Sequence, residues 1–186
     1  MGFTQQKNRV LVVGAGSWGT AIARIAATNA RRHGSSFVER VVLWVHDEKL
    51  GPSEEELLSA SINRTHCNAK YLPEASLPEN VVAEPDLAKA AHQANLVIFA
   101  VPQQFIHTGL FAKILAGCAP NTRVLSLVKG LSFDEGPPKL VSSQIRDEMQ
   151  LDVSVLMGAN VAAEVCCCPE NSSGSHVTSY AHLNLL

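Results

Sequence analysis

Apolar strand-like segments alternate with helical segments along most of this chain, and the alternation predicts an α/β fold with a doubly wound, mainly parallel sheet. Two further observations support this fold. The continuous apolar run at 95–101 is typical of a parallel strand covered on both faces. The segment 17–32 combines helical character with a face of alanines, which suits close packing on a sheet. With 186 residues and 46% hydrophobic residues, the chain can form one globular domain or slightly more.

The expected elements follow in chain order. Strands are expected at 9–13, 39–45, 81–84, 95–101, 123–128 and 153–157. Helices are expected at 17–32, in a short stretch from Ser53, and at 85–93, 103–115 and 136–149. Ser53 can cap the short helix, with Glu56 at the capping-box position. Pro137 and Pro138 are tolerable in a first helical turn. Residues 63–78 are expected to form a loop.

The character of the sequence changes after Val165. Residues 166–186 are rich in Ser, Asn and Gly and show neither a helical nor a strand period, so we expect a divergent, disordered tail. The expected domain therefore spans 1–165. The five cysteines are odd in number and include no CxxC pair, and three of them are adjacent. We expect reduced thiols and no metal site.

Most of the functional information lies in the segment 14–19, Gly-Ala-Gly-Ser-Trp-Gly, which follows the first expected strand and opens the first helix. Gly14 permits a tight turn, Gly16 lets a pyrophosphate approach the backbone, and Gly19 lets the helix pack closely on the strand. The helix N-terminus adds free N–H groups and a partial positive charge. The segment predicts a dinucleotide site; the alternative is a glycine turn used only for packing.

Ligands of such sheets bind beyond the carboxyl ends of the strands, which makes three further residues candidates. Asp47, with Glu48 as the alternative, could receive ribose hydroxyls, although it lies further past Gly19 than the usual roughly 20 residues. An acid there repels a 2′-phosphate and favours NAD over NADP; otherwise it is a solvated loop carboxylate. Lys129 suits a phosphate or a polarised carbonyl, or is a surface lysine. Phe105 either stacks on a cofactor ring or belongs to the core.

Other classes of function are not favoured. The net charge of −2 gives no basic field for nucleic acid. The sequence contains no run of 18 apolar residues and therefore predicts no membrane span. The polar N-terminus is unlike a secretory signal, so we expect a cytoplasmic protein. His46, His92 and His107 lack the spacing of a zinc site or a Ser-His-Asp arrangement.

Several segments in series resemble the N-terminal domain of eukaryotic NAD-dependent glycerol-3-phosphate dehydrogenase. They lie at 13–21, 43–45, 68–73, 77–83, 99–105, 126–130 and 155–160. The three glycines are generic. Lys-Tyr-Leu-Pro at 70–73, Val-Pro-Gln-Gln-Phe at 101–105 and Leu-Met-Gly-Ala-Asn at 156–160 are much more specific.

The resemblance implies a Rossmann-type fold, NAD as cofactor, and the interconversion of sn-glycerol 3-phosphate and dihydroxyacetone phosphate. The residues that it implies hold the pyrophosphate are Gly14, Ala15, Gly16, Ser17, Trp18 and Gly19. It implies that Phe105 contacts the cofactor, that Ala162 borders the nicotinamide and that Lys129 lies beside the substrate. His46 stands where the family commonly has a phenylalanine against the adenine, so we expect weaker stacking there.

In this family an all-helical domain follows the last strand and supplies the catalytic lysine and the groups that hold the phosphate. The resemblance stops at Val165, so we expect that this helical domain is missing and that the chain carries no catalytic residue of its own. We expect it to bind NAD and to turn over very poorly. A non-catalytic NAD-binding module and an inactive truncated or spliced product remain alternatives. An apolar face left by the missing domain would allow a homodimer.

Overall fold

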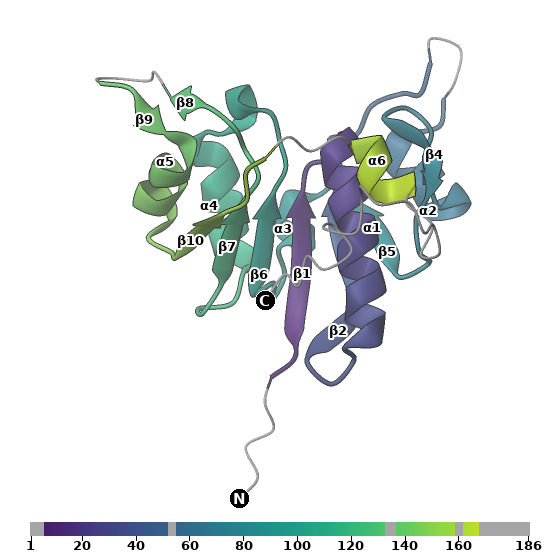
Figure 1. The fold of residues 1–186 in the computed structure, drawn as a ribbon, viewed down its shortest axis with the longest axis horizontal. Helices are drawn as coiled ribbons and strands as arrows, with labels where there is room; N and C mark the ends of the chain where they lie inside the picture. Colours follow the sequence, from purple (N-terminus) through teal and green to yellow (C-terminus); the bar gives the residue numbers. More distant parts are fainter. Residues whose placement is uncertain (1–5, 52–54, 133–136, 159–161, 168–186) are drawn as a thin grey trace, which may run out of the picture.

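The structure is a computed structural model that describes residues 6–51, 55–132, 137–158 and 162–167 of the chain. Its centre is a six-stranded sheet in the order β10-β7-β6-β1-β2-β5, and every pairing in this sheet is parallel (Figure 1). The strands are β1 (Asn8–Val13), β2 (Phe37–Trp44), β5 (Val81–Glu84), β6 (Leu96–Phe99), β7 (Arg123–Ser126) and β10 (Val153–Val155). The expected doubly wound, parallel fold is confirmed.

Helices cover both faces of this sheet. On one face lie α1 (Ser17–Arg32) and α2 (Leu58–Thr65); on the other lie α3 (Leu87–Ala90), α4 (Thr108–Gly117) and α5 (Val141–Met149). The alternation of side chains along β1 explains the two layers, because Val10 and Val12 pack under α1 while Leu11 and Val13 pack under the opposite helices. Both faces are therefore apolar, as a covered parallel sheet requires.

Two short antiparallel ribbons and a last helix complete the described fold. Strands β3 (Cys67–Asn68) and β4 (Leu72–Ser76) pair beside α1, and β8 (Leu131–Ser132) pairs with β9 (Lys139–Leu140). Helix α6 (Ala162–Cys167) packs against α1 and β4 (Figure 1). The expectation of a plain loop over 63–78 was wrong. Leu72 and Ala75 are buried there, and the exposed Pro73 between them concealed the strand pattern.

The expected helix from Ser53 was also wrong in its start. Ser53 lies outside the described residues, and α2 begins at Leu58. Glu56 precedes the helix and forms an ion pair with Arg64 instead of a capping box. The carboxylate of Asp47 accepts the Ser59 N–H at the start of α2 at 3.0 Å. A distant residue thus replaces the local cap that the sequence suggested.

Three other helices differ in length from their expected ranges. The stretch 103–115 divides into a 3₁₀ turn, η1 (Gln103–Phe105), and α4, because Ile106 and His107 are extended. His107 then caps α4 through its Nδ1, which accepts the Leu110 N–H. Helix α3 ends at Ala90, and α5 starts at Val141, after Pro137 and Pro138.

The last described helix crosses the boundary that was expected at residue 165. Cys166 lies within α6 and is only 4% exposed, packed with Ala21 and Leu72. Arg24 donates a hydrogen bond to the Cys166 carbonyl at 3.0 Å. Ordered structure therefore continues to Cys167. The expected tail beyond it lies outside the described residues and stays a prediction.

Candidate dinucleotide site

The candidate site lies where the order of the strands reverses. Strand β1 has β2 on one side and β6 on the other, so the chain leaves β1 in one direction and later returns on the opposite side. A crevice opens at this switch point, beyond the carboxyl ends of the strands. It holds a cavity of about 360 Å³ lined by Gly16–Trp18, Ala100–Gln103 and Leu127–Lys129. The ends of β1, β6 and β7 thus meet around one hollow.

The three glycines of the β1–α1 turn have different surroundings. Gly14 has a φ of +110°, which side chains rarely adopt, and a Cβ there would press on Val101 and on the Ala100 carbonyl. A Cβ on Gly19 would overlap the Gly14 carbonyl, so α1 could not approach β1. A Cβ on Gly16 would meet nothing within 4 Å. The first two glycines therefore serve the fold, and the third keeps the rim of the cavity open.

The turn also presents unpaired donors. Within the part of the chain that the structure describes, the backbone N–H groups of Gly16, Ser17 and Trp18 have no hydrogen-bond acceptor. Gly16 is the N-cap of α1 and brings no side-chain cap, and no acidic residue lies in the first turn. Arg31 and Arg32 lie in the last turn. The N-terminus of α1 is thus free and positive, which is the arrangement that binds phosphate groups.

Lys129 brings a cation to the same cavity from the end of β7. Its ammonium donates a hydrogen bond of 2.6 Å to the Gly158 carbonyl, just after β10, and the side chain stays exposed. The adjacent Gly130 has a φ of +135°, and a Cβ there would overlap the Gln103 side chain. Gln103 in turn donates to the Leu131 carbonyl. The loop after β7 is therefore held against the 3₁₀ turn η1, with Lys129 at the mouth of the cavity.

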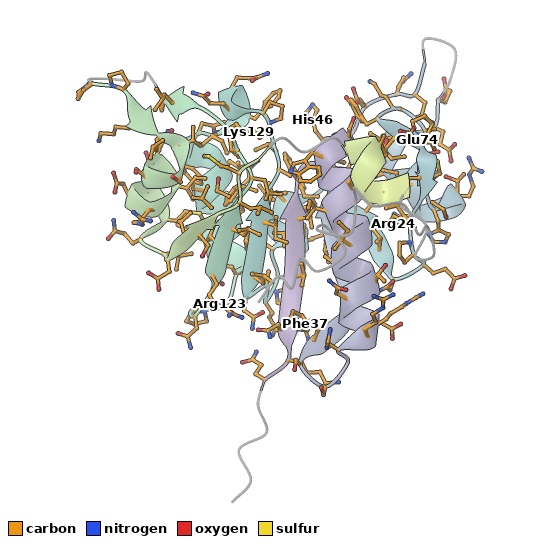
Figure 2. All side chains as sticks on the ribbon, viewed as in Figure 1. Arg24, Phe37, His46, Glu74, Arg123 and Lys129 are labelled. Atoms are coloured by element: carbon orange, nitrogen blue, oxygen red, sulfur yellow. The ribbon has the colours of Figure 1, made fainter. Side chains whose placement is uncertain are left out.

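The residues expected around the adenosine lie at the end of β2. Asp47 accepts two hydrogen bonds from Ser59, from its N–H at 3.0 Å and its hydroxyl at 2.8 Å. His46 is exposed and lies at the same end of the sheet as Lys129 (Figure 2). A carboxylate has about four acceptor positions, so Asp47 keeps capacity for further donors.

Glu48, the alternative acid, is committed elsewhere. It accepts the Lys70 ammonium at 2.5 Å and the Tyr71 hydroxyl at 2.6 Å. The hydrogen bond from Lys70, followed by that from Tyr71, holds the pKa of Glu48 below its ordinary value. The hydrogen bond that Lys70 makes to Glu48 raises the pKa of Lys70, and the one that Tyr71 makes to Glu48 raises the pKa of Tyr71. Glu48 is thus an ionised partner of the β3–β4 turn.

Two expected cofactor contacts do not line this cavity. Phe105 is 51% exposed at the end of the 3₁₀ turn η1. Ala162 is half-buried on α6, in the cluster that Trp18, Leu72 and Cys166 form beside α1. Trp18 touches both regions, because it also lines the cavity. The structure therefore brings Gly16, Ser17, Trp18 and Lys129 together, and it places Phe105 and Ala162 outside the lining.

Sequence reasoning missed one buried polar residue at the site. Asn68, on β3, donates to the Ala15 carbonyl at 2.8 Å and to the Thr20 hydroxyl at 2.8 Å. The sequence gives no local signal for these contacts, because Ala15 and Thr20 lie 53 and 48 positions away from Asn68. The only hint is that Asn68 opens one of the segments that resemble the dehydrogenase family.

The described residues contain no group of three or more His, Cys, Asp or Glu side chains arranged to hold a metal ion. None of the helices in the described ranges is long and apolar enough to cross a membrane. The site is instead built from backbone donors, one cation and apolar walls.

A parallel sheet in this strand order, with an open glycine turn and a free helix N-terminus at the switch point, defines the class of dinucleotide-binding domains. Residues 9–171 match the family described as the N-terminus of NAD-dependent glycerol-3-phosphate dehydrogenase. The chain belongs to this family, whose cofactor is NAD.

Relatives of known description agree. The chain is 46% identical over 159 residues to a glycerol-3-phosphate dehydrogenase 1-like protein of Danio rerio, covering 84% of this chain and 43% of that protein. It is 46% identical over 160 residues to a cytoplasmic NAD-dependent glycerol-3-phosphate dehydrogenase of Mus musculus, covering 84% and 44%. A mitochondrial enzyme of Saccharomyces cerevisiae is 39% identical over 157 residues, covering 84% and 35%.

A solved structure of glycerol-3-phosphate dehydrogenase from Saccharomyces cerevisiae superposes with a TM-score of 0.79 at 34% identity, covering 87% of this chain and 44% of that one. The enzyme of Plasmodium falciparum gives 0.77 at 34% identity, covering 86% and 43%. The chain spans less than half the length of the relatives that it matches. The resemblance stated from the sequence is therefore confirmed for the N-terminal, NAD-binding part.

Proposed function

We propose that this chain binds NAD as the cofactor-binding half of a glycerol-3-phosphate dehydrogenase. The observation that carries the proposal is the turn at 16–18, where three unpaired N–H groups border an open cavity at the switch point of the sheet. A pyrophosphate accepts such hydrogen bonds and gains from the helix dipole. Even a Cβ atom at Gly16 would meet no other atom within 4 Å, so the turn leaves room for a phosphate group and the residues present fit this cofactor.

The remaining cofactor contacts follow from the positions of the residues. In this proposal Gly14, Ala15 and Gly19 shape the turn, and Gly16, Ser17 and Trp18 hold the pyrophosphate. Asp47 accepts the ribose hydroxyls with the lone pairs that Ser59 leaves free, and His46 stacks weakly against the adenine. Phe105 contacts the cofactor and Ala162 borders the nicotinamide, although neither residue lines the cavity. When bound, NAD supplies the acceptor for a hydride.

The proposed reaction converts sn-glycerol 3-phosphate to dihydroxyacetone phosphate. Besides the hydride acceptor that bound NAD would supply, oxidation of the secondary alcohol requires a base to take its hydroxyl proton, and the reverse reaction requires that proton back. Lys129 places its positive charge at the mouth of the cavity, where it can bind the substrate phosphate or the carbonyl oxygen. We assign no base to the described residues. The family resemblance places the catalytic lysine in the helical domain of these enzymes.

A second candidate function is an NAD-binding module that does not turn over. It is favoured by one observation, that the described residues around the cavity supply backbone donors and one cation but no group to which we assign the role of the base. In either case we propose a small-molecule ligand and a homodimer, without nucleic-acid or membrane partners. We propose a cytoplasmic location, which is that of the enzyme from Mus musculus, whereas the enzyme from Saccharomyces cerevisiae is mitochondrial.

The first test is a titration of the purified chain with NADH, followed by fluorescence, together with NADH oxidation in the presence of dihydroxyacetone phosphate. We expect saturable NADH binding and very slow oxidation. Lys129→Ala should weaken the binding of dihydroxyacetone phosphate to the NADH complex, whereas Lys113→Ala, an exposed lysine on α4, should not. Absence of NADH binding by a folded chain would refute the cofactor assignment. Turnover at the rate of a full-length relative would refute the second candidate, because the chain would then supply its own base.

A further inference from the structure

Asn68 is an uncharged polar residue with no exposed surface, and both hydrogen bonds that its side-chain nitrogen donates go to the β1–α1 turn and the first turn of α1. Its Nδ2 donates to the Ala15 carbonyl and to the Thr20 hydroxyl, both at 2.8 Å. Its Oδ1 accepts the Tyr71 N–H at 3.1 Å. The Thr20 hydroxyl donates in turn to the Ala15 carbonyl at 3.3 Å. The carbonyl between the first two glycines of the turn is thus held from two directions.

Fixing the Ala15 carbonyl also fixes the next donor. The peptide unit between Ala15 and Gly16 is planar and trans, so its C=O and N–H point in opposite directions. Because Asn68 holds the carbonyl on its own side, the Gly16 N–H is directed away from Asn68. Gly16 borders the cavity, and its N–H has no acceptor among the described residues. Asn68 therefore sets the orientation of a donor that it does not itself touch.

The loop that carries Asn68 has two more attachments. The Ser17 hydroxyl donates to the Tyr71 carbonyl at 2.6 Å, which joins residues 68–71, the brace loop, to the first residue of α1. Lys70 and the Tyr71 hydroxyl bind Glu48, which follows β2. The brace loop thus connects the turn after β1 to the end of β2, the two places where the pyrophosphate and the adenosine of a dinucleotide are proposed to lie.

We propose that Asn68 is a positioning residue for the cofactor: it orients the Ala15–Gly16 peptide so that the turn is already shaped to receive a pyrophosphate. This inference rests on the proposed function, because it assumes that NAD occupies the cavity. A preformed donor array binds more tightly than one that must be ordered on binding. Loss of Asn68 therefore weakens cofactor binding even where the protein remains folded.

The chain contains a matched residue that separates this role from general stability. Asn63, on α2, donates to the Ala83 carbonyl at 2.9 Å and accepts the Ala83 N–H at 2.8 Å. Like Asn68, it fixes a backbone segment through its amide, but the segment that it fixes, the middle of β5, contributes no residue to the lining of the cavity. Removing either amide leaves polar backbone groups without a partner, so both changes should lower stability.

The test compares Asn68→Ala, Asn68→Asp and Asn63→Ala in the full chain, by denaturant unfolding and by titration with NADH and with ADP-ribose. We expect all three variants to lose stability. Only the two Asn68 variants should lose tenfold or more in affinity, equally for both ligands, because both contain the pyrophosphate. Asn68→Asp keeps an acceptor for Tyr71 but cannot donate to Ala15. Because it also adds a buried negative charge that repels a pyrophosphate, the uncharged Asn68→Ala is needed beside it to assign the loss to the donated bonds.

The outcomes are distinguishable. If the wild-type chain binds neither ligand, the proposed function fails before Asn68 is tested. If the wild-type binds and a folded Asn68→Asp binds equally well, or if Asn63→Ala loses as much affinity, the positioning role is wrong. Should both Asn68 variants fail to fold, Thr20→Val removes one acceptor of Asn68 while keeping the side-chain volume. Thr20→Val should lose several-fold in affinity for both ligands, and unchanged affinity would overturn the inference.

Discussion

At the scale of single residues, the site depends on which positions must lack a side chain and for which reason. A side chain at Gly19 would overlap the backbone of Gly14, and Gly14 itself has a φ of +110°, which side chains rarely adopt. Gly16 differs, because its surroundings are open and its backbone is extended, with φ −66° and ψ 178°. A Cβ there would meet no other atom within 4 Å, and Gly16 lines the cavity in which we propose that a ligand binds.

This difference gives a residue-scale prediction. Gly16→Val should leave the free energy of unfolding within about 0.5 kcal/mol of the wild-type value, as is usual for surface changes. The same variant should lose NADH affinity by at least roughly tenfold, or about 1.4 kcal/mol, because the side chain blocks the approach to the turn. Denaturant unfolding and NADH titration measure the two quantities.

Gly34→Val is the control, since a Cβ at Gly34 would meet only the Arg31 carbonyl, at 3.8 Å, and the position lies far from the cavity lining. It should change neither quantity beyond the same limits. Normal NADH binding by Gly16→Val would show that no ligand approaches the turn at this residue.

The residues of the site differ in how far the sequence could reveal them. Gly14–Gly19 and Lys129 follow strand ends, so their position could be inferred from local patterns. Asn68 could not, because its partners come from a turn 53 positions earlier. The hydrogen bonds from Ser59 to Asp47 could not be predicted for the same reason, because the two residues lie 12 positions apart and are joined across a loop. Local sequence instead favoured Ser53 as the cap of the helix.

At the scale of elements, the end of β2 and the β3–β4 turn are joined by charge. Glu48 forms an ion pair with Lys70, and Lys70 lies over the ring of Tyr71 at 5.4 Å. Because Lys70 and Tyr71 hold the pKa of Glu48 below its ordinary value of 4.5, the folded protein resists protonation of this carboxylate. The unfolded chain therefore takes up the proton first as the pH falls.

The stabilising contribution of Glu48 should thus be complete above about pH 4.5 and disappear as the pH falls through the lower, folded-state pKa. Glu48→Gln should lower the free energy of unfolding at pH 7, and its difference from the wild type should shrink on acidification to pH 3. Urea unfolding at several pH values measures this difference.

Glu74→Gln, on β4, is the control, because it removes a carboxylate that makes no ion pair among the described residues. A constant difference between Glu48→Gln and the wild type across this range would contradict the role of the ion pair.

Elements with a strong periodic pattern were predictable, and those that depend on distant partners were not. The apolar run that forms β6 and the alanine face of α1 correspond closely to the expected segments. The β3–β4 ribbon was missed, because its five-residue second strand contains a proline and a glutamate and is supported by burial against α1. The interruption between η1 and α4 at Ile106 also depends on tertiary packing, since Ile106 is buried in the core beneath α3, α4 and α5.

At the scale of the whole molecule, the sheet ends in an edge that carries apolar side chains. Among the described residues β10 pairs only with β7, and Val155 and Met157, on and just after β10, are 43% and 51% exposed. An edge strand with exposed apolar side chains favours association between chains. This edge is therefore the contact at which we predict self-association.

The corresponding prediction is that the chain self-associates through β10 as its concentration rises. The double variant Val155→Lys and Met157→Lys should reduce this association, because lysine blocks edge-to-edge pairing. Sedimentation velocity over a range of concentrations measures it. Leu57→Lys is the control, since Leu57 is similarly exposed, at 42%, but pairs with Lys49 away from this edge. Equal association of the double variant and the wild type would exclude β10 as the contact.

The hydrogen bond between Lys129 and the Gly158 carbonyl has a consequence for the whole site. The ammonium has three N–H donors and this carbonyl takes one of them, so two remain for an anion. The bond also fixes the position of the ammonium, so an anion that binds there need not first order the lysine side chain. The segment after β10 thus determines where the positive charge stands at the mouth of the cavity.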